Sequence, residues 1–381
     1  MRVLFIHPSP HLTGAGRMLA LLAKHLRRRR HETLVVLPGP GPLARVHAED
    51  LGSIVFVPMT PIRRSPSAIA RHLLEFPQTV HRLERLIRTW RPDLVHVNGV
   101  YTLWAGIAAR RAGVSCLYHV HEALESYPPW LYRMWQALVG KLASRIVLVH
   151  ENLRAAWTDF ASRLLVIENG VDVERIRAYV RESSSADLRR AWGDRSPILL
   201  CPSHIMPGKN QLLLVRAAPT IFRQLPEARI IFLGRTHGRA TNEAYRRELQ
   251  RLARALGVET RLRFVDEPED AHRAYGAADL VVSTSPLESF GLIPLEGLAA
   301  GKPVVAVRTA IAEELQARGH AIRTVSRDDP EELAQAIVEL LAMPYSPEAL
   351  ALPREYEAEY VVARFEIVYA GMLDERRATA S

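Results

Sequence analysis

The chain has 381 residues, of which 48% are hydrophobic and 24% charged, as in a folded globular protein of about two domains rather than a disordered or fibrous one. No apolar run approaches the roughly 18 residues that a membrane-spanning helix requires, and the opening MRVLFIHPSP is expected to be a strand rather than a signal peptide. The two cysteines, Cys116 and Cys201, are too few and too far apart for a disulfide framework or a cysteine metal site. These features predict a cytoplasmic protein.

The net charge of +9 is concentrated in the first half of the chain. Residues 1–175 hold 23 Lys and Arg against 13 acidic residues, whereas residues 176–381 hold 27 against 28. The arginines at 27–30 and those spread over 71–91 favour an anionic partner: a membrane surface, a lipid-linked diphosphate or an acidic glycan. A solvated arginine-rich face is the alternative. Nucleic acid is not expected, because no reader motif accompanies the charge.

Short apolar runs alternate with helical patterns along the chain. Strands are predicted at residues 3–6, 33–37, 94–98, 116–120 and 146–149, and, after the serine-rich RESSSADLRR, at 198–201, 230–233, 262–265, 280–283 and 304–307. The alternation predicts an α/β protein with two Rossmann-like, doubly wound parallel-sheet domains. We expect the first domain at residues 1–175, the second at 176–346, and helices at 347–381 that cross back to the first domain.

The segment HPSPHLTGAGRM follows the first predicted strand and provides two glycines next to a predicted helix. Gly14 and Gly16 let the backbone approach a phosphate or sugar at a helix N-terminus. A dinucleotide-binding fingerprint requires a third glycine where Leu19 stands, which argues against a nicotinamide dehydrogenase.

The segment LYHVHEALE contains two histidines at the end of a predicted strand. His119 and His121 point to the same face of the strand, and His121 is nearer the carboxyl end, where ligands of parallel sheets bind. An imidazole can donate or accept a hydrogen bond to a sugar hydroxyl. Two histidines and a carboxylate are a weak signal for a metal, and no metal is expected.

The stretch SPLESFGLIPLEGLAAGKPVV, residues 285–305, predicts a loop followed by a helix. Pro294 is tolerated in a first helical turn, so the helix is expected to begin near Leu292. Glu288 then lies in the loop and Glu296 in the helix.

The start of this helix predicts an anion site. The amides of Phe290, Gly291 and Leu292 have no intrahelical partner, and Gly291 has no side chain that would keep a ligand away. Apolar runs on both sides read as buried parallel strands, so the ligand is expected at the carboxyl end of a strand.

The spacing E-x7-E from Glu288 to Glu296, followed by an apolar helix and G-K-P-V-V, resembles the retaining, nucleotide-sugar-dependent glycosyltransferases of GT-B fold, the large family numbered four. The resemblance implies that Glu288 lies beside the transferred sugar, that Glu296 binds the ribose, and that the amides of residues 290–292 hold the diphosphate. His121, followed by the acidic Glu122, matches the histidine that contacts the donor sugar in this family.

Six further donor-site positions are compared with the same family. Lys209 matches the lysine that clamps the donor diphosphate, but Ser203 and His204 stand where the family carries Gly and Arg, and His204 is charged only when its pKa permits. Gly234 and Val265 match positions near the nucleotide. Gly14 and Gly16 lie in the segment where the family commonly carries Gly-Gly-x-x-Arg, with Thr13 at the first glycine position.

The resemblance predicts an enzyme that moves a sugar from a nucleoside-diphosphate sugar to an acceptor hydroxyl with retained anomeric configuration. The donor is a co-substrate, and neither a cofactor nor a metal is expected. The acceptor is a glycan, a lipid-linked or a small molecule. The protein is expected to be cytoplasmic, either free or peripheral at the inner face of the cytoplasmic membrane. The alternatives are a nucleotide-sugar epimerase of the same fold and a non-catalytic nucleotide-sugar-binding partner subunit.

Overall fold

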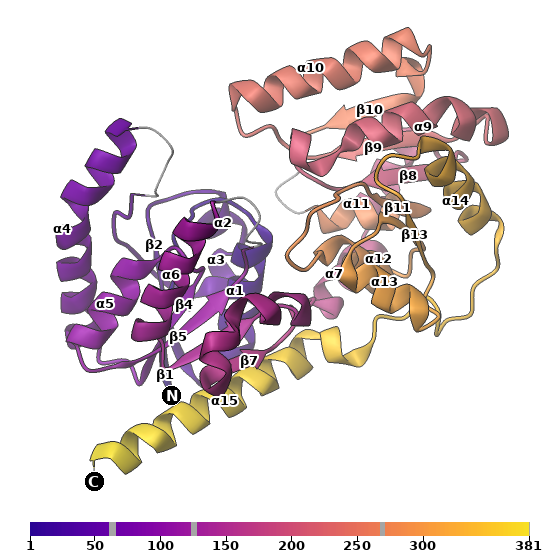
Figure 1. Ribbon diagram of the computed structural model, residues 1–381. Helices are drawn as coiled ribbons and strands as arrows, with labels where there is room; N and C mark the ends of the chain where they lie inside the picture. The colour runs from indigo at the N-terminus through magenta and orange to yellow at the C-terminus, as the bar shows by residue number, and fades with distance from the viewer. Residues whose placement is uncertain (61–65, 123–127, 267–270, 381) are drawn as a thin grey trace. The chain divides into compact units, whose positions relative to one another are not determined.

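The computed structural model describes residues 1–60, 66–122, 128–266 and 271–380 (Figure 1). The chain divides into two compact units. Unit 1 comprises Met1–Gly170 and Glu355–Ser381, and unit 2 comprises Val171–Arg354.

Unit 1 is built on a parallel sheet. Its strands are β1 (Arg2–Ile6), β2 (Glu32–Leu37), β3 (Ser53–Phe56), β4 (Leu94–Asn98), β5 (Ser115–Val120), β6 (Arg145–Leu148) and β7 (Leu164–Val166). In the part of the chain that the structure describes, these seven strands lie in the order β3-β2-β1-β4-β5-β6-β7, and every neighbouring pair is parallel.

Two helical layers cover this sheet. Its helices are α1 (Gly14–Arg28), α2 (Pro42–Val46), α3 (Ala48–Leu51), α4 (Pro66–Trp90), α5 (Leu103–Arg111), α6 (Pro129–Leu142), the 3₁₀ segment η2 (Glu151–Arg163), the short η5 (Arg354–Tyr356) at the boundary with unit 2, and α15 (Ala358–Ala380). Helix α1 packs against α3 and α15, and α5 packs between α4 and α6. The strands are therefore buried on both faces, which explains why they read as continuous apolar runs.

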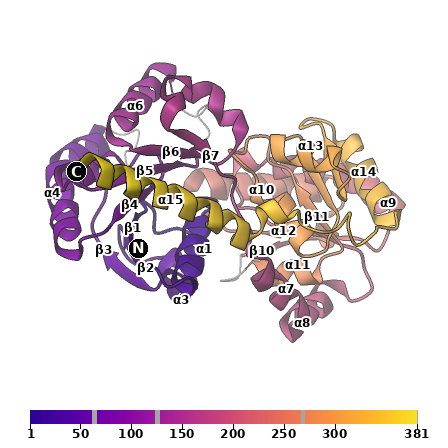
Figure 2. The ribbon, with the colours of Figure 1, turned by 90° about the horizontal axis from the view of Figure 1, so that it is seen from below.

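The last helix, α15, returns to unit 1 and lies beside α1 and β5 (Figure 2). Val361, Phe365 and Tyr369 recur at helical spacing and join the same apolar core as Phe5 of β1. The helix was expected to begin at residue 347 but begins at Ala358. Pro353 disfavours helical backbone in the residue before it, so the preceding segment forms turns instead.

Unit 2 repeats the same architecture. Its strands are β8 (Ile198–Cys201), β9 (Arg229–Leu233), β10 (Leu262–Val265), β11 (Leu280–Ser283), β12 (Val304–Val307) and β13 (Ile322–Val325). Over the described ranges, the six strands are parallel in the order β10-β9-β8-β11-β12-β13. Two doubly wound parallel sheets confirm the predicted fold class.

The helices of unit 2 also form two groups. They are α7 (Val173–Arg181), α8 (Ser183–Gly193), η3 (Pro207–Lys209), α9 (Gln211–Gln224), α10 (Ala240–Ala255), η4 (Glu259–Arg261), α11 (His272–Ala277), α12 (Leu292–Ala299), α13 (Ala310–Ala317) and α14 (Pro330–Ala342). Helix α9 packs against α10 and α14, and α7 packs against α8, α11 and α12.

All ten predicted strands are present, with ends that differ by at most one residue. Three further strands, β3, β7 and β13, were not predicted. Each of the three lies at the edge of its sheet.

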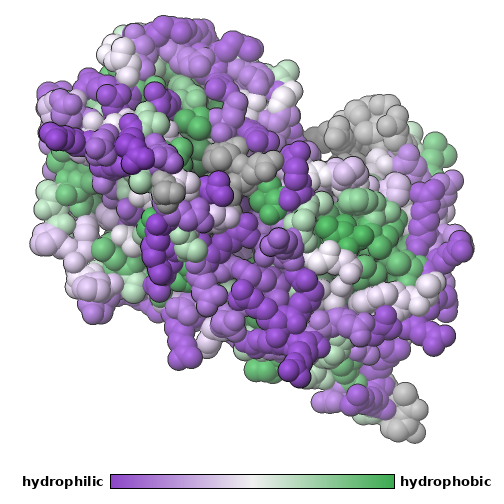
Figure 3. All heavy atoms as spheres, turned by 180° about the vertical axis from the view of Figure 1, so that it is seen from behind, coloured by the Kyte–Doolittle hydropathy of each residue, from purple (hydrophilic) through white to green (hydrophobic). Residues whose placement is uncertain are grey.

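The surface is mainly hydrophilic on the face shown in Figure 3, where hydrophobic residues gather in smaller patches. Within the described ranges, no helix combines the length and the apolar composition needed to cross a membrane.

Candidate functional site

In both units the predicted site residues lie at or near the carboxyl ends of strands, at or near the point where the strand order reverses. In unit 1 this point lies between β1 and β4, and in unit 2 between β8 and β11. Loops that leave two neighbouring parallel strands toward opposite faces open a crevice at their carboxyl ends, which is the usual ligand position in such sheets.

In unit 2 the structure brings Lys209 and Glu288 together. Lys209 ends η3 after β8, and its Nζ lies 2.5 Å from Oε1 of Glu288 in the loop after β11. Thr284 Oγ1 donates to the carbonyl oxygen of Lys209 at 2.6 Å and ties the two loops together. The side chains of Lys209 and Glu288 are 24% and 20% exposed, so the pair can reach a ligand.

Helix α12 begins at Leu292, as predicted. Gly291 precedes it with φ of 94°, a left-handed conformation that side chains rarely adopt. In the part of the chain that the structure describes, the amides of Gly291 and Leu292 have no hydrogen-bond acceptor. They therefore remain available to an anion beside the Lys209 ammonium group.

Glu296 lies in the second turn of α12 and is only 4% exposed. Its Oε2 accepts a hydrogen bond from Tyr275 Oη at 2.6 Å, and its Oε1 lies 3.3 Å from Nε2 of His272. Both partners come from α11 and were not predicted as site residues. They fix the carboxylate that the family resemblance assigns to the ribose.

Two of the predicted residues, Gly234 and His204, have a structural role in the packing of the loop after β8. A side chain at Gly234 would place its Cβ 2.1 Å from the carbonyl oxygen of Ser203, so the glycine is required where β9 ends. Gln211 Nε2 donates to Ser203 Oγ at 3.0 Å and to the carbonyl of His204 at 2.8 Å. The His204 ring stands 4.3 Å from that of His237, and the Val265 carbonyl accepts the Gly234 amide at 3.0 Å.

In unit 1 a hydrogen bond from His121 to Asn98 orients the imidazole ring. The Asn98 side-chain amide donates to the carbonyl of Ala15 at 2.9 Å, so its Oδ1 faces His121 Nε2 at 2.7 Å. Because Oδ1 only accepts, Nε2 of His121 carries the proton and Nδ1 keeps its lone pair. Asn98 is 1% exposed and connects the ends of β4 and β5 with the start of α1.

Three buried histidines accompany His121. The rings of His119 and His121 are 4.0 Å apart, and those of His96 and His119 are 5.3 Å apart. Burial holds the pKa values of His96, His119 and His121 well below 6.5, with repulsion from neighbouring histidines as a second cause. Burial also lowers the pKa of His7 to about 4, against a smaller opposite effect of the Asn98 carbonyl. The imidazole of the candidate site is therefore neutral at pH 7.

Glu122 follows His121 and accepts the amides of His121 and Val100 at Oε2, each at 3.1 Å. These bonds join the ends of β4 and β5 a second time. Burial raises the pKa of the carboxyl group, against the lowering effect of its backbone hydrogen bonds.

The two glycines near β1 were expected in a loop before the helix, but they lie within the helix itself. They lie in the first turn of α1, whose N-cap Thr13 accepts the Gly16 amide at 3.1 Å. A Cβ at Gly16 would lie 3.1 Å from Cδ2 of Leu43, which shows that Gly16 allows close packing in the core. Gly14 is exposed at the first position of the helix.

The basic segment at residues 27–30 is partly occupied within unit 1. Arg29 forms ion pairs with Glu359 and Glu366 of α15, and Arg27 donates to backbone carbonyls before β3. These two arginines hold α15 and α3 in place and are therefore not free to bind an anionic partner.

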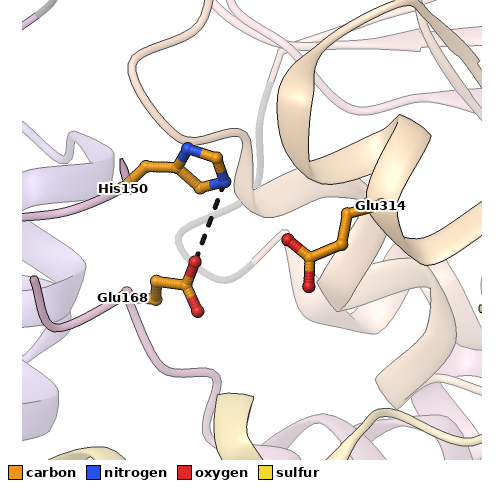
Figure 4. A group of neighbouring side chains, drawn as sticks. All are labelled: His150, Glu168 and Glu314. Atoms are coloured by element: carbon orange, nitrogen blue, oxygen red, sulfur yellow. Dashed lines mark ion pairs between the residues drawn. The ribbon is translucent and has the colours of Figure 1, made fainter. Parts of the chain in front are cut away.

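Figure 4 shows a separate acidic and imidazole group, in which His150 Nε2 lies 3.7 Å from Glu168 Oε1. Glu314, labelled in the same figure, belongs to unit 2. Among the described residues of unit 1, no third potential ligand joins the pair. Two ligands are fewer than protein metal sites commonly use.

Comparison with known proteins assigns both halves of the chain to domain families. Residues 12–175 match the model described as Glycosyltransferase Family 4, and residues 196–343 match Glycosyl transferases group 1. The chain is 28% identical, over 76% of its length and 78% of the relative's, to a GDP-mannose-dependent alpha-(1-6)-phosphatidylinositol monomannoside mannosyltransferase of Mycolicibacterium smegmatis. It is 32% identical, over 72% of its length and 68% of the relative's, to D-inositol 3-phosphate glycosyltransferase 2 of Catenulispora acidiphila.

Solved structures share the fold. Anabaena Alr3699/HepE in complex with UDP and glucose has a TM-score of 0.79 at 23% identity, covering 97% of this chain and 99% of that one. A glycosyltransferase from Rickettsia africae has a TM-score of 0.80 at 17% identity, covering 98% of each chain.

Proposed function

The chain belongs to the glycosyltransferases, with a family 4 domain followed by a group 1 domain, and on this premise we propose that it transfers a sugar from a nucleoside-diphosphate donor to an acceptor hydroxyl with retention of configuration. The observation that carries the proposal is the group formed by Lys209, Glu288 and the start of α12. It combines one cation, one carboxylate and unpaired amides at the carboxyl end of a sheet.

Unit 2 supplies the groups for the donor diphosphate in this proposal. Cleavage of the sugar–phosphate bond places negative charge on the leaving diphosphate. The Lys209 ammonium and the amides of Gly291 and Leu292 are positioned to interact with that charge, and such interactions lower the barrier when they strengthen in the transition state. Glu296, fixed by Tyr275 and His272, is assigned to the ribose hydroxyls.

Glu288 has a double role in this proposal. Without a donor it neutralises Lys209, and with a donor it exchanges that contact for a hydroxyl of the sugar while Lys209 turns to the phosphate. A carboxylate beside the sugar also stabilises the oxocarbenium-like charge that develops as the bond to phosphate breaks.

His121 of unit 1 is assigned to a sugar hydroxyl. With Nε2–H donated to Asn98, its Nδ1 can accept a hydrogen bond and does not add positive charge. The acceptor oxygen attacks C1 on the face that the diphosphate leaves, and a donor phosphate oxygen takes the acceptor proton. One C–O bond breaks and one forms, and the proton leaves with the nucleoside diphosphate.

The names of the relatives support two acceptor classes. One relative acts on a phosphatidylinositol mannoside and another on inositol 3-phosphate. We infer a polyol or sugar hydroxyl as the acceptor, carried by a lipid or by a small phosphorylated molecule.

A donor screen tests the proposal directly. A panel of nucleotide sugars is measured for its effect on the melting temperature, and the stabilising donor is then incubated with candidate acceptors. We expect one donor and its nucleoside diphosphate to raise the melting temperature. This rise is expected to be lost in Lys209→Ala and kept in the control Arg247→Ala, which changes an exposed residue. Equal stabilisation of both variants would contradict the site, and an inverted anomeric configuration by NMR would contradict retention.

The same experiment separates the two alternatives. An epimerase of this fold consumes the donor without any acceptor. A non-catalytic binding subunit is stabilised by the donor but releases no nucleoside diphosphate, even with the acceptor present.

A further inference from the structure

Helix α6 carries an apolar stripe on its solvent side. Trp130, Met134 and Leu138 follow at intervals of four residues, which places them on one face of the helix. Their exposed fractions are 68%, 44% and 37%. The opposite face already supplies the contacts to the core of unit 1, through the buried residues Tyr132, Trp135, Gln136, Val139 and Gly140. Packing within unit 1 therefore does not explain the stripe.

The charged side chains of α6 itself are basic. Residues 126–150 contain three basic residues and no acidic one. Arg145 is paired with Glu375 of α15. The exposed side chains of Arg133 and Lys141 form no hydrogen bond or ion pair with any residue that the structure describes.

Arg133 and Lys141 lie on the same side of α6 as the stripe. Lys141 follows Leu138 by three residues, and Arg133 precedes Ala137, which is also exposed, by four. The solvent face of α6 thus combines apolar side chains with two free cations, and its composition differs from that of the arginine segment at residues 27–30, where Arg29 is paired with acids.

We propose that the exposed face of α6 binds peripherally to an anionic lipid bilayer. Trp130, Met134 and Leu138 enter the interface between head groups and acyl chains, and Arg133 and Lys141 lie among anionic head groups. An amphipathic helix with a tryptophan and only basic charges fits this boundary, because the bilayer offers both apolar depth and negative surface charge. A protein partner would need its own acidic and apolar complement to this face.

If the proposed function holds, the position of α6 connects membrane binding with access of the acceptor. The helix follows β5, so its first turn lies at the edge of the sheet where β5 ends and His121 begins the loop. A bilayer at this helix would present a lipid-borne acceptor to the same edge. The binding itself requires no donor and no catalysis, so it can be tested separately.

Vesicle binding of the full chain tests the proposal. Vesicles of phosphatidylcholine mixed with phosphatidylglycerol are compared with vesicles of phosphatidylcholine alone by co-sedimentation. We expect at least a tenfold stronger partitioning to the anionic vesicles, decreasing as the salt concentration rises. Equal partitioning to both vesicles, or none to either, would overturn it.

Matched variants locate the contact. The triple variant Trp130→Ser, Met134→Ser, Leu138→Ser is expected to partition to vesicles at least tenfold more weakly. The double variant Arg133→Glu, Lys141→Glu is expected to show this decrease on anionic vesicles only. The control triple, Leu256→Ser, Met343→Ser, Ile367→Ser, removes exposed apolar side chains elsewhere and is expected to bind as the unmodified chain does. An equal loss in the control would contradict an α6-specific contact.

Tryptophan fluorescence provides an independent reading. Of the six tryptophans, Trp104, Trp135, Trp157 and Trp192 are buried and Trp90 is partly buried, so Trp130 is the exposed one. Its emission is expected to shift to shorter wavelength on anionic vesicles, and the shift is expected to vanish in Trp130→Phe. A shift that persists in this variant, or a dimer in light scattering that the serine triple dissolves, would assign the face to another role.

Discussion

The two units share one architecture but prepare their candidate ligand positions in opposite ways. In unit 1 the residues at the strand switch are buried and uncharged: His121, Asn98 and His7 are 9%, 1% and 3% exposed. In unit 2 the corresponding position holds a partly exposed ion pair between Lys209 and Glu288. Unit 1 therefore offers directional hydrogen bonds in a fixed arrangement, and unit 2 offers charge that can be redistributed.

The difference has a physical reason in the chemistry assigned to each unit. A neutral sugar is distinguished by the direction of hydrogen bonds, which requires fixed donors and acceptors. A leaving diphosphate is stabilised by positive charge and unpaired amides. The two units should consequently respond differently to pH and to substitution.

The largest expected effect is the destabilisation of unit 1 in acid. Four buried histidines have lowered pKa values in the folded state, so the unfolded chain binds more protons below pH 6.5. The contribution of these histidines to the free energy of unfolding is complete above this pH. As the pH decreases below 6.5, it falls by up to about 1.4 kcal/mol per pH unit for each histidine. Glu122, with a raised pKa, opposes this in its own range.

Urea denaturation followed by tryptophan fluorescence at several pH values measures this effect, since five of the six tryptophans lie in unit 1. His119→Phe removes one buried imidazole and is expected to reduce the slope by one proton. A stability that does not change between pH 7 and 5 would contradict the burial of neutral histidines.

The next largest effect concerns the charged site of unit 2. Lys209→Ala is expected to lower kcat by about 10² to 10³, because it removes the cation opposite the leaving diphosphate. Single-turnover transfer with the identified donor measures the loss. Lys209→Arg keeps the charge and should recover part of the rate; equal rates for the alanine variant and the unmodified enzyme would exclude the assigned role.

A smaller effect is expected for Asn98→Ala in unit 1. The change removes the acceptor for His121 Nε2–H and the donor to the Ala15 carbonyl, which leaves buried groups unpaired. We expect kcat/KM for the donor sugar to fall about tenfold, because one such unpaired group costs about 1 to 3 kcal/mol. Binding of the nucleoside diphosphate alone serves as the control and should change little. A change confined to diphosphate binding would be inconsistent with a role in orienting His121.

The smallest effect is expected at the N-cap of α1. Thr13→Ala removes the acceptor for the Gly16 amide and should lower the free energy of unfolding by about 1 kcal/mol. Thr13→Ser keeps the hydroxyl and should retain the stability in the same denaturation experiment. If both variants lose equally, the hydroxyl is not the cause.

Most of the fold could be predicted because central parallel strands are buried on both faces. The runs at β1 and β11 are almost wholly apolar and define the strands directly. The unpredicted β3, β7 and β13 are strands of only three or four residues at sheet edges, where fewer neighbours cover the strand. The sequence IRTV of β13 shows this, with Arg323 exposed on the strand.

The candidate site could be predicted where its residues share one local motif. Glu288, Gly291 and the start of α12 lie within a few residues, so spacing and helix chemistry indicate them. Asn98, Tyr275 and His272 act over separations of 21 to 24 residues through tertiary contacts. Nothing in their own segments distinguishes them from ordinary strand or helix residues.

The return of α15 to unit 1 affects the order in which the protein can form during synthesis. Unit 2 is a continuous insertion between Gly170 and Glu355, so all its contacts are available once Arg354 has left the ribosome. Unit 1 must wait for Phe365 and Tyr369 to cover the core beside α1. A nascent chain therefore carries apolar residues of unit 1 that are not yet covered until α15 has emerged from the ribosome.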